Sequence, residues 1–240
     1  MYRRTACLAA ILAAVQLTSP VLACAASTTY ILTGSDAFRV GVRSGRVVFS
    51  GHQRLVTYAR DGSEYFRATV SYSRRDASGT QAKRASFLQQ TATGFNGQFV
   101  DLVNRDPDYV SVLSQPLSIQ LRPDDVRALQ NLKSRADLEF PLGIGESNLL
   151  GHIQRLRLHA KKGLLAFSFF ATGMMNGPLA RHHQLVVRGS VTMSGVAYYD
   201  IRNGRLLEIE DGIQLRGRLY DGGKVSPVTI SYIRKMHVLR

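Results

Sequence analysis

Residues 184–220, QLVVRGSVTMSGVAYYDIRNGRLLEIEDGIQLRGRLY, carry the pattern that decides the fold. Apolar residues recur at alternate positions in two arms on either side of Asn203-Gly204. Side chains alternate between the two faces of a strand, so each arm is predicted to be a strand with one apolar, buried face (the dry face) and one polar, solvated face (the wet face). Asn-Gly accepts positive φ at both central positions of a type I′ turn, which predicts a hairpin. The dry face should carry Leu185, Val187, Val191, Met193, Ala197 and Tyr199 from the first arm, and Leu207, Ile209, Ile213, Leu215 and Leu219 from the second.

The two arms are long and contain glycine. Each spans roughly 15 residues, whereas a usual strand has about 5–6. Gly189 and Gly195 interrupt the first arm, and Gly212 and Gly217 interrupt the second. Interior glycine weakens a flat strand and permits a bulge or a bend. The pattern therefore favours a sheet that curls, and the alternative is that each arm is two ordinary strands broken at the glycines.

The rest of the chain is mostly alternating apolar segments separated by turns. Residues 164–172 are apolar enough for a strand that is buried on both faces, and residues 173–178 indicate a turn. One helix is predicted over about 123–133, because Pro123 suits a first turn, two aspartates follow it, and apolar residues then recur every third position. The predicted fold class is therefore mainly β: an antiparallel, strongly curved sheet or barrel-like meander with one short α-helix.

The first 25 residues are typical of a secretory signal peptide. Arg3 and Arg4 precede an apolar run over 8–17, and small residues follow at Ala23-Cys24-Ala25. The run is shorter than the roughly 20 residues of a membrane span. We therefore expect an exported, periplasmic or secreted protein with a single β-rich domain over 26–240.

Both cysteines of the chain, Cys7 and Cys24, lie in this segment. Cleavage after Ala25 would leave no cysteine, which would remove disulfides, thiolate catalysis and cysteine-ligated zinc. Alternatively, Val21-Leu22-Ala23-Cys24 resembles the lipobox of bacterial lipoproteins, in which the cysteine is acylated and anchors the protein. Plain cleavage is the favoured interpretation, because Leu22 is an unusual residue at its position in that motif.

The chain carries 31 Lys and Arg against 17 Asp and Glu, for a formal net charge of +14. Such an excess favours polyanionic partners. The basic residues are spread singly, however, and an exported protein rarely meets nucleic acid. We therefore expect no specific nucleic-acid partner, and attraction to an anionic envelope surface instead.

Side chains that could carry chemistry lack the spacing of a known site. His182 and His183 are adjacent, and His152 and His159 are predicted to lie on opposite faces of a strand, so neither a metal nor a cofactor is expected. Two carboxylates, those of Glu208 and Glu210, share one wet face about 7 Å apart. Glycosidases use similar separations, but Arg205, Arg216 and Arg218 are expected to neutralise both groups.

Apolar residues near the hairpin form a candidate ligand site. Flexible thioethers beside aromatic rings suit an adaptable apolar cavity, although they equally suit the filling of gaps in a core. The candidate residues are Phe167, Phe169, Met174, Met175, Met193, Tyr199, Ile213 and Leu215.

Three functional hypotheses follow from these observations. The first is a non-enzymatic binding protein for an apolar or amphipathic ligand, such as a lipid, held by the curved sheet. The second is a hydrolase or isomerase with acidic or histidine residues at a barrel mouth. The third is a structural or protein-interaction domain without a small-molecule site.

Overall fold

The computed structural model describes residues 27–60, 63–90, 98–99, 108, 116–141, 148–159, 162–179 and 182–239. The predicted signal segment and both cysteines lie outside these residues. The elements are β1 (Ser27–Val40), β2 (Arg43–Arg60), β3 (Ser63–Asp76), β4 (Gly79–Gln90), β5 (Gln98–Phe99), α1 (Pro123–Gln130), β6 (Arg135–Pro141), β7 (Asn148–His159), β8 (Leu164–Leu179), β9 (His182–Asp200), β10 (Arg205–Asp221) and β11 (Lys224–Val238).

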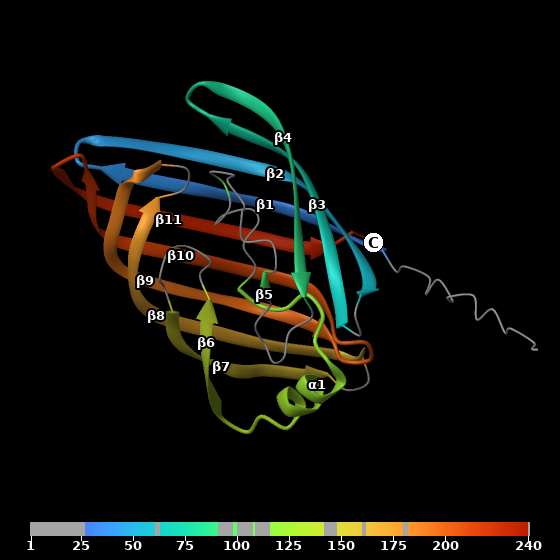
Figure 1. The fold of residues 1–240 in the computed structure, drawn as a ribbon. Helices are drawn as coiled ribbons and strands as arrows, with labels where there is room; N and C mark the ends of the chain where they lie inside the picture. The colour runs from blue at the N-terminus through green and yellow to red at the C-terminus, as the bar shows by residue number, and fades with distance from the viewer. Residues whose placement is uncertain are drawn as a thin grey trace, which may run out of the picture.

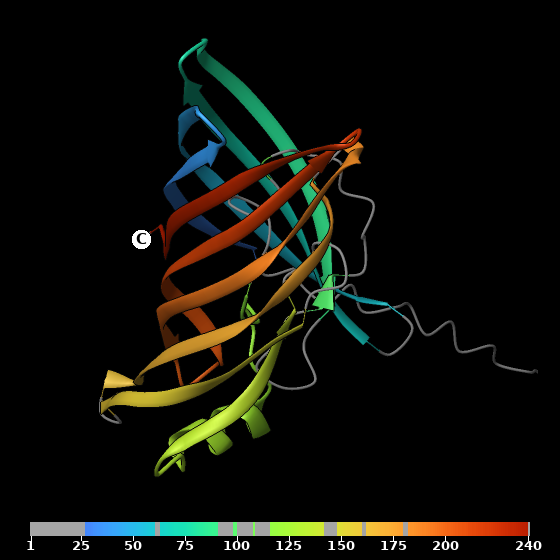
Figure 2. The ribbon, with the colours of Figure 1, turned by 90° about the vertical axis from the view of Figure 1, so that its left-hand side faces the viewer.

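The strands form one antiparallel sheet in the order β5-β4-β3-β2-β1-β11-β10-β9-β8-β7-β6 (Figure 1). The first and last long strands pair in the middle of this sheet, with Leu32 of β1 opposite Met236 of β11. The sheet curls strongly around its long axis (Figure 2). In the described part of the chain β6 pairs only with β7, so the sheet does not close. The mainly β, antiparallel, strongly curved prediction is confirmed.

The hairpin of 184–220 is also confirmed, and each arm is one continuous strand, so the alternative of arms broken at glycine is wrong. Leu207 was wrongly assigned to the dry face, because a bulge between Leu206 and Glu208 places Leu206 in the core and leaves Leu207 half-buried. The connection is not a type I′ turn, because Arg205 pairs with Asp200 and leaves a four-residue loop. Gly204 ends this loop with a φ of 70°. A Cβ at Gly204 would lie 2.2 Å from the carbonyl oxygen of Leu121, so the segment packed against the loop also requires glycine.

Two strand glycines permit aromatic rings to lie flat over the sheet. A Cβ at Gly34 would meet the ring of Phe49 at 2.4 Å, and a Cβ at Gly195 would meet the ring of Phe169 at 2.5 Å. Both glycines lie on the face that the curl encloses, which we call the inner face. Without these glycines the neighbouring strands would have to spread apart.

Two segments differ from the sequence prediction because strand pairing extends further than expected. Strand β8 continues through the predicted turn at 173–178, since it stays paired with β9 as far as Leu179. The expectation that 164–172 is buried on both faces is wrong, because Phe170 is 42% exposed on the outer face. A bulge in β7 between Arg155 and Arg157 shifts the register, so His152 and His159 lie on the same, outer face instead of opposite faces.

Helix α1 begins at the predicted residue and ends earlier than predicted, at Gln130. Its start combines Pro123 at the first helical position with a carboxylate of Asp125 that accepts from the backbone N–H of Arg122. Its apolar stripe, Val126 and Leu129, is buried. The helix lies at the end of the curled sheet where the β9–β10 loop is found (Figure 1).

Candidate functional site on the inner face

Strands β8 and β9 supply an apolar, aromatic half of the inner face. The ring of Phe167 stacks on that of Tyr199, with centroids 5.6 Å apart and an interplanar angle of 11°. The ring of Phe169 stacks on Phe140 of β6 at 5.9 Å. Met193 is buried in the same cluster. This half presents rings and a thioether, which together form a deformable apolar surface.

The structure brings most of the predicted ligand residues together here. Phe167, Phe169, Met175, Met193, Tyr199, Ile213 and Leu215 all belong to the buried apolar cluster. Met174 does not join them, because β8 remains a strand there and adjacent strand residues point to opposite faces. Met174 is 66% exposed on the outer face.

The segment 116–121 covers the inner face at the end where α1 lies. The hydroxyl of Tyr199 donates to the carbonyl oxygen of Ser118, and that of Tyr30 donates to Leu206 at 2.7 Å. The segment also exchanges backbone hydrogen bonds with β10 and the loop before it, including Leu206 N–H to Ile119 at 2.9 Å. Burial raises the pKa of both tyrosines, so their hydroxyls remain donors.

A buried ion pair lies on the inner face of β10 and β11. The Nε of Arg234 donates to Oδ1 of Asp211 at 2.9 Å, and its Nη2 donates to Oδ2 at 3.0 Å. The hydroxyl of Tyr232 reaches Oδ2 at 3.4 Å. Neither charged side chain is exposed. Burial raises the pKa of Asp211, and the adjacent guanidinium opposes that rise.

A second buried carboxylate, that of Asp108, lies against β3 and β4. It accepts from the hydroxyl of Tyr72 at 2.9 Å, from Nε of Arg74 at 3.1 Å and from Nζ of Lys83 at 3.1 Å. Arg74 also pairs with Asp76. The Asp108 side chain is thus the acceptor at the centre of this cluster.

Gln53 of β2 is a further polar group on the inner face. It is fully buried, and neither its amide oxygen nor its amide nitrogen has a hydrogen-bond partner within the described structure. A buried amide without partners is costly. Gln53 is opposite Tyr30 of β1 in the sheet register, which places it near the covered end.

The inner face is therefore amphipathic. Apart from Arg155, the inner residues of β6 to β9 are mostly apolar, whereas β10, β11, β3 and β4 carry buried charged groups among further apolar residues. One row of the sheet shows the transition: it runs from Arg234 through Asp211 and Gly195 to Phe169.

Sequence reasoning missed the two charged clusters, although one signal was present. Asp211 occupies the same parity as Ile209 and Ile213, and Arg234 the same parity as Tyr232 and Met236. A charged residue at a strand position that is predicted to face the core indicates a buried ion pair. Asp108 carried no such signal, because no periodic pattern surrounds it.

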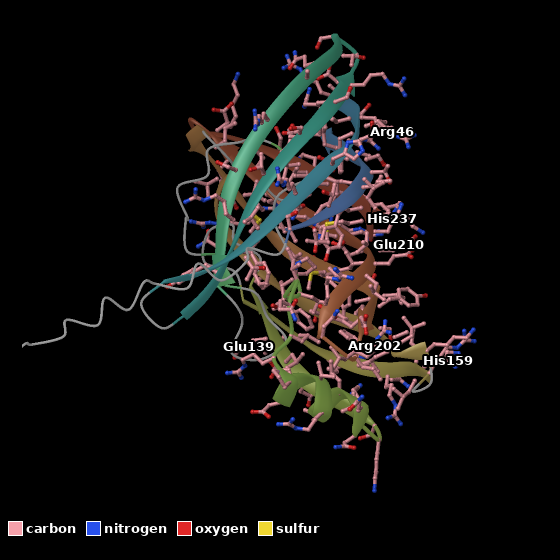
Figure 3. All side chains as sticks on the ribbon, turned by 90° about the vertical axis from the view of Figure 1, so that its right-hand side faces the viewer. Arg46, Glu139, His159, Arg202, Glu210 and His237 are labelled. Carbon is pink, nitrogen blue, oxygen red and sulfur yellow. The ribbon has the colours of Figure 1, made fainter. Side chains whose placement is uncertain are left out.

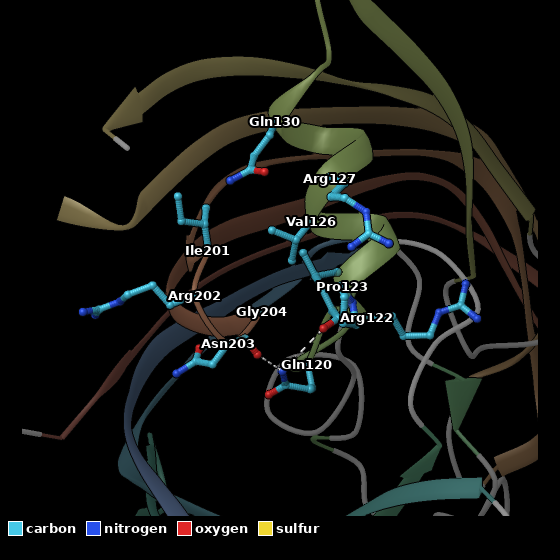
Figure 4. Close-up of a pocket in the computed structure, with 11 residues that line it drawn as sticks. Gln120, Arg122, Pro123, Val126, Arg127, Gln130, Ile201, Arg202, Asn203 and Gly204 are labelled. Carbon is cyan, nitrogen blue, oxygen red and sulfur yellow. Dashed lines mark hydrogen bonds between the residues drawn. The ribbon is translucent and has the colours of Figure 1, made fainter. Parts of the chain in front are cut away.

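Two of the hollows formed by the described residues adjoin residues considered above. One, of about 360 Å³, is formed by α1 and the β9–β10 loop, with Gln120 donating to the carbonyl oxygen of Asn203 at its rim (Figure 4). The other, of about 680 Å³, is an open depression on the outer face of β9, β10 and β11.

The outer depression contains the paired carboxylates. Glu208 and Glu210 both contact Nζ of Lys235, at 2.9 and 3.7 Å. They are thus neutralised by β11 rather than by the predicted arginines. Glu210 points outward along one margin of the molecule (Figure 3).

No protein-family model matches the chain, and no curated protein matches its sequence. Among the described residues, no three histidine, cysteine, aspartate or glutamate side chains are grouped closely enough to hold a metal ion. In the same residues no helix is both long and apolar enough to cross a membrane.

Proposed function

We propose that this protein is a non-enzymatic binding protein that holds an amphipathic ligand, such as a lipid, along the inner face of its curled sheet. The observation that carries the proposal is the division of that face. Its apolar, aromatic side adjoins a side with buried hydrogen-bonding and charged groups. An amphipathic molecule has the same division along its length.

In this proposal the apolar part of the ligand packs against Phe167, Phe169, Met175 and Met193. Burial of apolar surface contributes about 25 cal/mol per Å², and methionine can repack around chains of different shape. The polar part lies toward Tyr232 and the Arg234–Asp211 pair.

The state of the buried carboxylates favours binding over catalysis. Asp211 accepts hydrogen bonds from Arg234, and Asp108 accepts from three donors. Carboxylate oxygens that already accept from protein donors are less accessible to a substrate. The leader-like sequence of residues 1–25 favours action in the bacterial envelope, either free or anchored through Cys24.

The chain has no tryptophan, which permits a matched test with two adjacent residues of β8. Phe169→Trp places a fluorophore on the inner face, and Phe170→Trp places one on the outer face. Each variant is titrated with 9,10-dibromostearate, whose bromines quench tryptophan at contact. We expect saturable quenching of Phe169→Trp and little quenching of Phe170→Trp.

Equal quenching of both variants, or of neither, would overturn the proposal. Far-UV circular dichroism of Phe169→Trp establishes that it is folded, and Met193→Trp provides a second inner probe if it is not. Native mass spectrometry of protein isolated from its own envelope fraction provides an independent check. A co-purifying lipid mass is the expected result, and a clean apo mass would contradict tight binding.

A further inference from the structure

The end of the sheet opposite α1 carries two hairpin turns that are held together. The β1–β2 turn lies at 41–42 and the β10–β11 turn at 222–223. The N–H of Gly41 donates to the carbonyl oxygen of Pro227 at 2.9 Å, which joins the two hairpins. Figure 1 shows both turns at the left end of the molecule, away from the helix. We call this region the turn end.

Apolar side chains are exposed at the turn end. Val42 is 98% exposed, Val225 is 53% exposed and Phe38 is 40% exposed. A single exposed valine needs no explanation, but three apolar residues gathered at joined turns form a feature that association would bury. None of them is needed to pack the core cluster.

The same end is strongly basic. Its exposed cations are Arg39, Arg43, Arg46, Arg188, Arg216, Arg218 and Lys224. Within the described residues, none of these seven forms an ion pair, and Asp221 is the one exposed carboxylate among them. The side chain of Arg46 points away from the sheet (Figure 3).

The end that carries α1 provides a contrast. Three of its arginines are ion-paired: Arg122 with Asp125, Arg127 with Asp124, and Arg202 with Asp200 at 2.9 Å. Both ends are rich in basic residues, but at the turn end none of the seven exposed cations has an ion-pair partner among the described residues.

We propose that the turn end docks on the surface of an anionic lipid bilayer. In this arrangement Val42 and Val225 enter the headgroup region, and the seven cations lie over anionic head groups. Nucleic acid would satisfy the cations but not the apolar turn residues, so a bilayer accounts for both features. This inference goes beyond ligand binding and does not depend on it.

The test is co-flotation of the purified protein with vesicles of phosphatidylcholine alone or with one quarter phosphatidylglycerol. We expect binding to the anionic vesicles that weakens as salt is raised, because salt screens exposed charges. The triple variant R39Q/R43Q/R46Q should lower the partition coefficient by about 100-fold, since each cation near an anionic surface contributes roughly fivefold. Val42→Asp should lower it by about tenfold or more, because it removes an apolar contact and adds a repelled charge.

The matched control is R122Q/R127Q/R202Q, which removes the same charge from the end with α1. We expect this variant to bind vesicles within about twofold of the unaltered protein, because its arginines are already paired. Equal losses in the two triple variants would overturn the assignment to the turn end. Unchanged binding by Val42→Asp, together with equally strong binding to duplex DNA, would overturn docking on a bilayer. Val42 is almost fully exposed, so its substitution leaves the fold intact.

Discussion

The guanidinium group of Arg234 and the carboxylate of Asp211 face each other across β11 and β10, and neither is exposed to solvent. Glycines flank the pair in the same row of the sheet, with Gly34 beside Arg234 and Gly195 beside Asp211. A buried pair recovers the cost of leaving water only where its geometry is good and further hydrogen bonds are made. The two-point contact and the Tyr232 hydroxyl meet these conditions.

Removal of one member of this pair should be strongly destabilising. Asp211→Ala leaves the Arg234 charge without its principal partner and should lower the free energy of unfolding by about 3–5 kcal/mol, measured by urea denaturation. Replacement of both members, as Asp211→Leu with Arg234→Met, should cost less than Asp211→Ala alone. At the more exposed pair, Glu208→Ala should cost under about 1 kcal/mol. A loss of unfolding free energy under about 1 kcal/mol for Asp211→Ala would contradict this account.

The tyrosine that ties the covering segment to the sheet offers a second test. Tyr199→Phe removes the hydrogen bond to Ser118 and should cost about 0.5–1.5 kcal/mol of unfolding free energy. Tyr198 is next in sequence, lies on the outer face, and makes no side-chain hydrogen bond within the described residues. Tyr198→Phe should therefore change stability by less than about 0.5 kcal/mol. Equal effects would show that the Tyr199 hydroxyl does not secure the segment.

Two strand glycines should respond differently to alanine. At Gly34 a Cβ would lie 2.4 Å from both the carbonyl oxygen of Ile233 and the ring of Phe49. The backbone oxygen cannot give way, so Gly34→Ala should cost about 1–3 kcal/mol. At Gly212 the nearest atom, the carbonyl oxygen of Tyr232, is 3.1 Å away. Gly212→Ala should cost clearly less in the same thermal or urea measurement, and the reverse order would refute the packing argument.

The carboxyl group of Asp76 should have an unusually low pKa. Hydrogen bonds from Ser78 and then from Arg74 lower its pKa to about 2. The pKa of Asp76 in the folded state lies below the ordinary value of about 3.9. Ionised Asp76 therefore stabilises the fold fully above a pH of about 3.9, and this stabilisation is lost as the pH falls toward 2. A carbonyl-detected NMR titration measures the midpoint. Ser78→Ala should raise it, and a midpoint already near 3.9 in the unaltered protein would contradict the arrangement.

Local pattern predicted the β elements well because strand alternation is a property of neighbouring residues. The odd positions from Val187 to Tyr199 were predicted to face one way, and all of them are on the inner face. The start of α1 at Pro123 was predictable for a similar reason, since a helix terminus depends on a few adjacent residues. Prediction was wrong where pairing with another strand overrode the local signal. Residues 173–178 contain glycine and proline, yet they remain strand because β9 pairs with them.

The candidate site was only half predictable. Phe167, Phe169 and Met193 could be assigned to one surface from their own strands. The contact between Arg234 and Asp211 depends on the register between β10 and β11, and Asp108 reaches Arg74 and Lys83 from a distant part of the chain. Register and loop placement are long-range properties, and the pattern within one strand does not specify them.

The amino-acid sequence by itself determined that this protein is built from long, glycine-containing strands with one apolar face, because side-chain alternation and backbone freedom are local. It also determined the strong positive charge, which is a matter of composition. Only the tertiary structure decided that the inner face combines aromatic rings with a buried ion pair. It also decided that seven exposed cations lie beside exposed apolar residues at the turn end, because both features depend on which strands become neighbours when the sheet curls.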